Sequence, residues 1–404
     1  MKTLLINLAE EGGTASPPLG LWSMRTNIPG DVDIWDNAID GDLLTNYEKG
    51  GYFPHYDVMG ISARFSSQHA DMLRYMLKGK ALADKLVLGG PHASYTQTEQ
   101  PYSNVCPPGE WGESFMLKKS LFIDDLNHPV FYTDELEPYW LKDKPHDKTL
   151  STVGWMPIEF SRGCGKRCTF CCVTDFWGPL QRHSLYWITA YLTYLAKEHG
   201  IAELLIEDDS FDLSTDWAWD VIEEMNRLDM WWSTPNGLPV RPLLQMCGNT
   251  HEDKWKILTE WCWRVSIPFE TGSPHTAKLM KIGNKYLHWE EAQELVLTLR
   301  EHDIQVAGFF IIGYPGETPD DIRQTLAYAN SLPLTDRYIY TATPYPGTAL
   351  YNESIEHKLI PYKGAELYKR LTYRKSVFPG TPTDDFRYVD REFASRRKAL
   401  KEQT

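Results

Sequence analysis

Residues 156–171 read MPIEFSRGCGKRCTFC, a short apolar run that leads directly into a loop with three cysteines. The run Met156–Phe160 has the length and composition of a buried strand. The thiols of Cys164, Cys168 and Cys171 follow on one loop, and their close spacing lets them converge on one soft metal centre. A 4Fe–4S cluster with three cysteine ligands leaves one iron open for a substrate or cofactor, as catalytic zinc sites leave one position open. The stretch therefore predicts a reactive iron–sulfur loop at the end of a strand.

A structural zinc site is the alternative interpretation of these cysteines. Such a site needs a fourth Cys or His ligand, and Cys172 could serve only with awkward geometry because it adjoins Cys171. Cys172 also leaves a second ligand set open, since Cys164, Cys168 and Cys172 have a regular spacing of their own. Seven cysteines is an odd total in a chain without an export signal, so we expect no disulfide framework.

Downstream of the cysteine loop, apolar strands and amphipathic helices continue to alternate. The further strands expected are Glu203–Ile206, Trp231–Ser233, Val265–Phe269, Gln305–Ile312 and Arg337–Thr341. The helices expected are Tyr186–His199, Thr215–Leu228, segments through Trp261, Trp289–His302 and Thr318–Leu332. The start of the last helix is well marked, with Thr318 as N-cap and Pro319 in the first turn. Six strand–helix units predict a partial (β/α)6 barrel of the TIM type over residues 153–350, with active residues at the carboxyl ends of its strands.

A separate alternating pattern precedes the cysteine loop. Buried parallel strands are expected at Thr3–Leu8, Val32–Trp35, Asp57–Ile61 and Lys85–Leu88, with a helix over Ser67–Ala83. This alternation predicts an α/β fold with a Rossmann-like, doubly wound domain over residues 1–118. Residues 119–152 are acidic and interrupted by proline, so they are expected to form a surface linker. Residues 351–404 are expected to form a C-terminal helical extension.

The composition excludes some classes of function. With 41 basic and 55 acidic residues the net charge is −14, which argues against sequence-independent nucleic-acid binding. From Lys363 onward the chain is locally basic, which fits a solvated tail or a docking patch. The opening apolar stretch Leu4–Ala9 is too short for a signal sequence, and no apolar run approaches the ~20 residues of a spanning helix. We therefore expect a cytoplasmic protein that contacts no membrane.

The spacing Cys-x3-Cys-x2-Cys after the first strand of a partial barrel resembles the radical S-adenosylmethionine (radical SAM) superfamily. Phe170 matches the aromatic residue that this family usually carries before its third cysteine, which selects Cys171 over Cys172. The resemblance implies a 4Fe–4S cluster whose open iron is chelated by the amino and carboxylate groups of S-adenosylmethionine. An electron from the cluster would cleave the sulfonium bond and give a 5′-deoxyadenosyl radical that takes hydrogen from the substrate.

Later motifs resemble those of the same family, in the same order. Residues 207–211 (EDDSF) match an acidic motif that receives the ammonium of the cofactor, and residues 269–273 (FETGS) match a motif near its ribose. Residues 308–318 match the fifth-strand signature near the adenine, and residues 343–348 match a segment common in cobalamin-type members. The S-adenosylmethionine-binding residues that the resemblance implies are Phe170, Glu207, Asp208, Asp209, Asn236, Glu270, Gly313 and Gly316.

The N-terminal region contains the stretches PPLGL (17–21), VMGIS (58–62), VLGGPHAS (87–94) and GEWGE (109–113). Together they resemble the cobalamin-binding domain of one large radical SAM subclass. Its glycine turns follow predicted strands, where backbone could approach a flat corrin and its nucleotide tail. The cobalamin-binding residues implied are Ser62, Gly89, Gly90, His92, Gly109 and Glu110. No Asp-x-His-x-x-Gly motif is present to ligate cobalt, and the connection between the first two strands leaves little room for the usual first helix. An alternative interpretation is a trimmed domain that binds substrate or only packs against the barrel. His92 could equally cap a loop.

The resemblance implies a methyltransferase if cobalamin binds, with a methyl group passing from S-adenosylmethionine through cobalt to a carbon or phosphorus centre. A cobalamin-free radical enzyme that cyclises, rearranges or oxidises its substrate is the second interpretation. A non-catalytic iron–sulfur protein is a third, from another class. Methylthiolation of tRNA would need a second cluster, and only Cys106 precedes the cysteine loop. The expected partners are a small-molecule or peptide substrate and an electron donor such as flavodoxin or ferredoxin.

Overall fold

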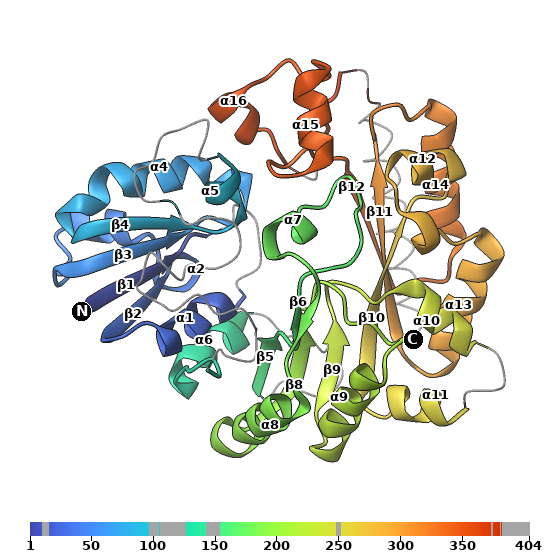
Figure 1. The fold of residues 1–404 in the computed structure, drawn as a ribbon, viewed down its shortest axis with the longest axis horizontal. Helices are drawn as coiled ribbons and strands as arrows, with labels where there is room; N and C mark the ends of the chain where they lie inside the picture. Colours follow the sequence, from blue (N-terminus) through green and yellow to red (C-terminus); the bar gives the residue numbers. More distant parts are fainter. Residues whose placement is uncertain are drawn as a thin grey trace.

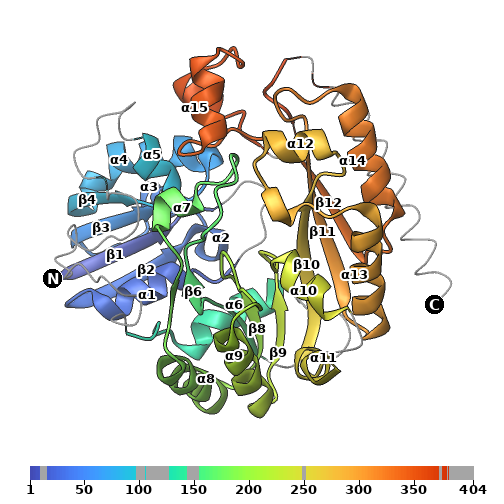
Figure 2. The same ribbon diagram turned by 45° about the vertical axis from the view of Figure 1, so that its right-hand side comes forward.

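The structure is a computed structural model that describes residues 1–9, 16–96, 105, 127–142, 154–247, 252–372, 375–379 and 381. Two parallel sheets lie side by side, and the short helices α15 (Ala349–Glu356) and α16 (Gly364–Tyr368) lie near the carboxyl ends of their strands (Figure 1). Figure 2 shows helices α8, α9, α13 and α14 around the outside of the second sheet. The predicted fold class, a doubly wound domain followed by a partial barrel, is confirmed.

The N-terminal sheet contains the four strands that the apolar runs predict. They are β1 (Lys2–Asn7), β2 (Asp31–Asp36), β3 (Tyr56–Ser62) and β4 (Ala83–Gly89), all parallel, in the order β2-β1-β3-β4. Val105 adds an isolated parallel bridge to Leu88 at the far edge. The expectation that β2 is buried is wrong, because it is an edge strand in which Asp36 alone is buried. The connection that was expected to leave little room for the usual first helix does contain one, since α1 (Leu19–Asn27) lies between β1 and β2 and buries Trp22.

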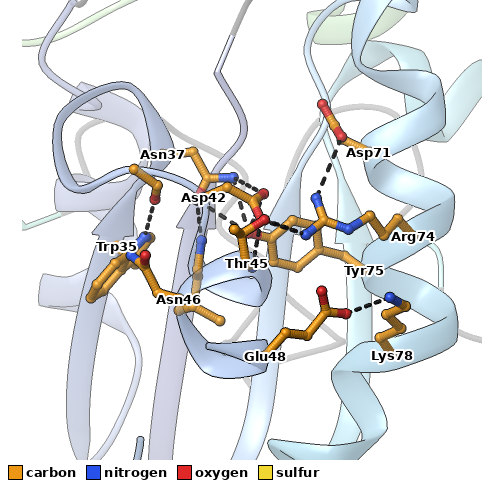
Figure 3. Close-up of polar contacts among 12 residues, drawn as sticks. Trp35, Asn37, Asp42, Thr45, Asn46, Glu48, Asp71, Arg74, Tyr75 and Lys78 are labelled. Atoms are coloured by element: carbon orange, nitrogen blue, oxygen red, sulfur yellow. Dashed lines mark hydrogen bonds and ion pairs between the residues drawn. The ribbon is translucent and has the colours of Figure 1, made fainter. Parts of the chain in front are cut away.

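Helices α2 (Asn37–Asp40), α3 (Leu43–Glu48) and α4 (His69–Lys78) are joined by polar contacts (Figure 3). Arg74 of α4 donates to Oδ1 of Asp42 at 2.5 Å and to Oγ1 of Thr45 at 2.9 Å. Burial would raise the pKa of Asp42, but the hydrogen bonds from Arg74 and Thr45 hold that pKa below its usual value. These contacts fix α3 against α4, so that the segment after β2 is ordered rather than a free loop.

The region expected to be a surface linker contains a helix that packs against both sheets. Helix α6 (Thr133–Lys142) buries Leu136 and Tyr139. Its Glu135 accepts two hydrogen bonds from Arg25 of α1, at 2.8 and 2.7 Å. Trp140 of α6 donates from Nε1 to the carbonyl of Trp155, in the first strand of the second sheet, at 2.7 Å. The described part of the predicted linker is therefore packed structure, which the interrupting Pro138 concealed in the sequence.

The second sheet has the six parallel strands expected of the partial barrel. They are β5 (Gly154–Ile158), β8 (Ile201–Ile206), β9 (Trp231–Thr234), β10 (Cys262–Glu270), β11 (Gln305–Ile312) and β12 (Asp336–Thr341), in the order β12-β11-β10-β9-β8-β5. The helices that cover it are α8 (Leu185–His199), α9 (Asp216–Arg227), α10 (Val240–Met246), α11 (Glu252–Thr259), α13 (Trp289–Glu301) and α14 (Pro319–Ser331). Alternate strand residues such as Met156, Leu204 and Trp232 pack with these helices in one hydrophobic core. Thr318 caps α14 and its hydroxyl accepts from the amide of Asp321, as predicted.

A separate hydrophobic core lies where the cysteine loop meets the C-terminal helices. It contains Cys168, Met280 and Tyr314 together with Leu367 and Tyr368 of α16. The described C-terminal segment is therefore part of the structure around the cysteines. Among the described residues, no helix is long and apolar enough to cross a membrane.

Candidate active site

The three cysteines lie on the loop that follows β5, at the carboxyl end of the second sheet. The loop runs from the two-residue strand β6 (Ser161–Arg162) to helix α7 (Val173–Trp177), and Figure 1 shows α7 between the two sheets. Cys164 is half-buried, Cys168 is buried and Cys171 is exposed, and all three are free thiols. The hydroxyl of Thr174 donates to the carbonyls of Cys164 and Lys166, at 2.7 and 2.6 Å, and closes the loop onto α7.

Two carboxylates from the end of β8 hold the start of this loop. Asp208 is buried, and it accepts from the amide of Phe160 at 2.7 Å and from the hydroxyl of Ser161 at 2.5 Å. Asp209 accepts from the amide of Gly163 at 3.1 Å. Gly163 has φ +87°, and a Cβ there would lie 2.8 Å from two backbone carbonyl oxygens, so only glycine fits. Burial raises the pKa of Asp208 well above its usual value and that of Asp209 to about 6.

The thiols themselves lie in a shielded environment. Burial raises the pKa of Cys168, an effect that the nearby ammonium of Lys285 opposes. Shielding by the surrounding chain also raises the pKa of Cys171 to about 12, although its side chain is exposed, and that of Cys172 to about 11. Within the part of the chain that the structure describes, no group of three Cys, His, Asp or Glu side chains is close enough to hold a metal ion.

The donor set nevertheless fits an iron–sulfur cluster in its chemistry. Three free thiols project from one loop whose backbone is held by two aspartates and by a glycine that no other residue could replace. Soft thiolate ligands of this number suit a cluster with one open iron. Cys172 is the residue before α7, which places it on the helical side of the loop.

Glu270, at the end of β10, is paired with a lysine that sequence reasoning missed. Nζ of Lys285 lies 3.0 Å from Oε1 of Glu270 and 4.0 Å from Sγ of Cys168. Burial would lower the pKa of Lys285, but the carboxylate of Glu270 raises it above its usual value. Glu270 has φ +65°, an uncommon backbone conformation for a residue with a side chain. Lys285 therefore brings a positive charge to the cysteine loop, which the carboxylate of Glu270 partly offsets.

The turn after Glu270 is tied to helix α14. Ser273 donates to Oδ1 of Asp321 at 2.5 Å, and the amide of Gly272 donates to Oγ1 of Thr325 at 3.2 Å. A Cβ at Gly272 would lie 2.5 Å from Cβ of Tyr328, so the motif needs glycine for a close approach. The motif at residues 269–273 therefore packs the turn against α14, in addition to any role in ligand binding.

Gly313 and Gly316 form the turn that follows β11, with φ +76° and +88°. The carboxylate of Glu317 accepts from the amides of Gly313 and Tyr314, at 2.6 and 2.9 Å. The backbone amides of the turn are therefore satisfied from within the chain. Sequence reasoning missed this role of Glu317, although a carboxylate one residue after a glycine turn was the available signal.

Glu207 and Asn236 lie at the ends of β8 and β9, on the side of the N-terminal sheet. Nδ2 of Asn236 donates to the carbonyl of Glu207 at 2.7 Å, which connects the two strand ends. Burial raises the pKa of Glu207 to about 7, an effect that the guanidinium of Arg64 opposes. Arg64 follows β3, so its charge reaches across from one sheet to the other. Phe170, by contrast, packs against the core around Cys168 and Tyr314.

The residues expected to bind cobalamin separate into three groups. Ser62, Gly89 and Gly90 lie at the carboxyl ends of β3 and β4, and the amide of Ala63 donates to the carbonyl of Gly89 at 2.8 Å. A Cβ at Gly90, where φ is +92°, would lie 2.5 Å from the carbonyl oxygen of Ala63. Gly109 and Glu110 lie outside the described residues.

His92 is placed inside the N-terminal domain rather than at its surface. Only 3% of it is exposed. Its Nδ1 lies 3.1 Å from Oγ of Ser66 and its Nε2 lies 2.9 Å from Nδ1 of His69, while Tyr368 of α16 packs against both rings. Burial lowers the pKa of His92 to about 3. In this structure both ring nitrogens are engaged by the protein itself.

The strand order of the N-terminal sheet marks a place where open α/β sheets bind ligands. The chain leaves β1 toward β2 on one side and β3 lies on its other side, so the crevice beyond the ends of β1 and β3 is a topological switch point. Among the residues that the sequence analysis selected for cobalamin, the one histidine, His92, has both ring nitrogens occupied by Ser66 and His69.

The comparisons with known proteins agree with this geometry. Residues 158–329 match the family model of the radical SAM superfamily. The chain is 28% identical over 287 residues to cytidylyl-2-hydroxyethylphosphonate methyltransferase of Streptomyces wedmorensis, covering 68% of this chain and 51% of the relative. It is 26% identical over 385 residues to an uncharacterized methyltransferase of Pyrococcus horikoshii, covering 86% and 80%. The chain thus spans about half the length of the first of these relatives.

A solved structure shares the fold. It is the radical S-adenosylmethionine methyltransferase TsrM of Kitasatospora setae with cobalamin and a 4Fe–4S cluster bound, which matches with a TM-score of 0.65 at 16% identity. The match covers 90% of this chain and 79% of that chain. The resemblance expected from the cysteine spacing is confirmed over residues 158–329, which match the radical SAM family model.

Proposed function

We propose that this protein is a cobalamin-dependent radical SAM methyltransferase that acts on an unactivated centre of a small molecule. The observation that carries the proposal is the loop of three thiols at the carboxyl end of the first strand of a six-stranded parallel half-barrel. The relatives named as methyltransferases, and TsrM with its bound cobalamin, support the choice of reaction. When bound, the cluster supplies one electron to S-adenosylmethionine, and cobalamin supplies a carrier for a methyl group.

The residues of the chain bind and orient these groups. Cys164, Cys168 and Cys171 hold the cluster, while Asp208 and Asp209 hold the loop that presents the thiols. The aromatic ring of Phe170 packs behind the loop and helps to exclude water from the cluster.

S-adenosylmethionine lies along the carboxyl ends of the neighbouring strands. The carboxylate of Glu207 is not engaged by a described hydrogen bond and receives the ammonium group, with Asn236 beside it. Glu270 faces the ribose, and the turn at Gly313 and Gly316 borders the adenine.

Cobalamin binds beyond the ends of β1, β3 and β4, at Ser62, Gly89 and Gly90. The proposal gives His92 no direct contact with cobalt, because its ring nitrogens already face Ser66 and His69. The substrate lies between the carboxyl ends of the two sheets. Flavodoxin or ferredoxin supplies the electron.

The decisive experiment is an anaerobic incubation of the reconstituted, reduced protein with S-adenosylmethionine, followed by mass spectrometry. The expected products are 5′-deoxyadenosine and S-adenosylhomocysteine, the latter requiring added cobalamin. Cys168→Ala should yield neither, whereas Cys247→Ala, which removes the cysteine that follows α10, should leave both unchanged.

Two outcomes would select another function. If 5′-deoxyadenosine forms but cobalamin never binds, the protein is a cobalamin-free radical enzyme that cyclises, rearranges or oxidises its substrate. If the cluster assembles and neither product forms, the protein is a non-catalytic iron–sulfur protein.

A further inference from the structure

We propose that Lys285 sets the reduction potential of the cluster, by placing a buried positive charge beside the sulfur of Cys168 under the control of Glu270. The inference rests on the proposed function, because it requires a cluster on Cys168. It concerns a residue outside every motif of the chain that sequence reasoning selected.

The geometry separates Lys285 from an ordinary surface lysine. Its Nζ lies 4.0 Å from Sγ of Cys168 and 3.0 Å from Oε1 of Glu270. Only 18% of its side chain and 7% of that of Glu270 are exposed, and Cys168 is 9% exposed. Charges that are shielded from water interact more strongly than surface pairs at the same distance.

The backbone on both sides of Lys285 is held by one arginine, Arg241. Lys285 ends the short 3-10 helix η5 (Gly283–Lys285), which connects α12 (Pro274–Leu279) to α13. Arg241 of α10 donates to the carbonyls of Asn284 and Tyr286, each at 2.7 Å, and pairs with Glu291 at 2.7 Å. Because Arg241 binds on both sides of Lys285, the ammonium group has a defined position above the cysteine loop.

A fixed charge at this place has a definite effect on redox chemistry. Reduction adds one negative charge to the cluster, and a nearby ammonium stabilises the reduced form more than the oxidised form. Lys285 should therefore raise the reduction potential. The carboxylate of Glu270 partly cancels that charge, so Glu270 should lower the potential. Removing the charge of Lys285 and removing the charge of Glu270 should therefore shift the reduction potential in opposite directions.

The test is a potentiometric titration of the reconstituted 4Fe–4S protein, followed by electron paramagnetic resonance in the absence of substrate. Lys285→Gln should shift the midpoint to a more negative potential, Glu270→Gln should shift it to a more positive one, and Lys285→Arg should stay close to the wild type. Lys197→Gln is the matched control, since this exposed lysine in the last turn of α8, next to the amino end of β8, undergoes the same change of charge. Its midpoint should not move.

Iron content, measured first, separates this inference from the proposed function. A wild-type protein that holds no cluster would refute the proposed function. Wild-type and variant proteins that hold equal clusters with equal midpoints would overturn the inference alone. If Lys285→Gln fails to assemble a cluster, the titration of Glu270→Gln still tests the inference. An unchanged or more negative midpoint in Glu270→Gln would contradict the predicted effect of the two charges on the potential.

Discussion

The carboxylate of Asp208 accepts a hydrogen bond of 2.5 Å from the hydroxyl of Ser161, and so connects the end of β8 to the first residues of the cysteine loop. Its second oxygen accepts from the amide of Phe160 at 2.7 Å. Both oxygens of this buried carboxylate are thus directed at the loop rather than at a ligand. The acidic motif that resembles a cofactor-binding element holds the cluster loop at this position.

Asp208→Ala should therefore impair assembly of the cluster. Loss of two hydrogen bonds to a buried carboxylate should lower the free energy of unfolding by about 2–4 kcal/mol. We expect the iron content after reconstitution to fall by at least half, measured together with a urea denaturation curve. Asp220→Ala, which removes an exposed carboxylate from α9, should change neither quantity. An Asp208→Ala protein with full iron content and weaker S-adenosylmethionine binding would show that the carboxylate serves the cofactor after all.

Replacement of single cysteines tests the ligand assignment. Cys164→Ala, Cys168→Ala and Cys171→Ala should each abolish the cluster, because three thiolates are the minimum for one site-differentiated 4Fe–4S centre. Cys172→Ala should retain about four irons per chain, since Cys172 precedes α7 and is not expected to be a ligand. Iron and sulfide analysis after anaerobic reconstitution measures both outcomes. Loss of the cluster in Cys172→Ala, with retention in Cys171→Ala, would reverse the assignment.

The strands and helices were predictable because their periodicity is local. The run Gln305–Ile312 became β11 with the same bounds, and Thr318 capped α14 as its neighbours indicated. Helix α6 was missed because Pro138 lies inside it and its buried face is short. Pattern reasoning weighs each segment alone, and this helix is stabilised by contacts with α1 and β5 that no local pattern contains.

The site was predictable only where spacing carries chemistry. The cysteines form a motif, but Lys285 meets Cys168 across 117 positions of the chain, and no spacing rule indicates such a contact. His92 shows a second kind of contact that the sequence does not indicate. A histidine after a glycine turn suggests a contact with a ligand. In the structure, however, Nε2 of His92 is hydrogen-bonded to His69, which lies 23 positions earlier on another helix. Contacts between residues that are far apart in the sequence depend on how the sheets pack. They can be predicted only once that packing is known.

The buried His92 should make the protein sensitive to acid. Its pKa in the folded state is lowered to about 3 by burial and by the neighbouring His69, whereas an unfolded histidine has a pKa near 6.5. Between these values the unfolded state binds the additional proton, so stability is complete above about pH 6.5 and falls as the pH decreases toward 3. As the pH falls, His92 alone should lower the free energy of unfolding by at most about 1.4 kcal/mol for each pH unit.

Urea denaturation between pH 7 and 4.5 measures this effect. His92→Gln should be less stable than the wild type at pH 7, by about 1–3 kcal/mol, because it disturbs the buried contacts with Ser66 and His69. Its stability should then fall less steeply with acid. His357→Gln, at an exposed position of the C-terminal segment, should follow the wild-type curve. Equal slopes for His92→Gln and the wild type would mean that His92 becomes protonated in the folded protein.

Binding of cobalamin to the N-terminal sheet should depend on Arg64. This exposed arginine follows Ser62 and Ala63 at the carboxyl end of β3, and its side chain faces the gap toward Glu207. The nucleotide tail of cobalamin carries a phosphodiester, which a guanidinium group can bind. We expect the wild-type protein to bind about one cobalamin, and Arg64→Glu to weaken binding by about tenfold, equivalent to roughly 1.4 kcal/mol.

Substitution of Gly90 would be a poorer test, because a side chain there meets the carbonyl of Ala63 and would disturb the fold itself. The matched control is Lys80→Glu, which makes the same change of charge at an exposed position near the amino end of β4. Equilibrium dialysis with absorbance spectroscopy measures the affinity, and iron content shows that the cluster is intact. Binding that is equally weakened by Lys80→Glu would indicate general charge attraction, and binding that Arg64→Glu leaves unchanged would place the cobalamin tail elsewhere. In the bound protein the cobalt should show no imidazole ligand by electron paramagnetic resonance, because His92 remains engaged with Ser66 and His69.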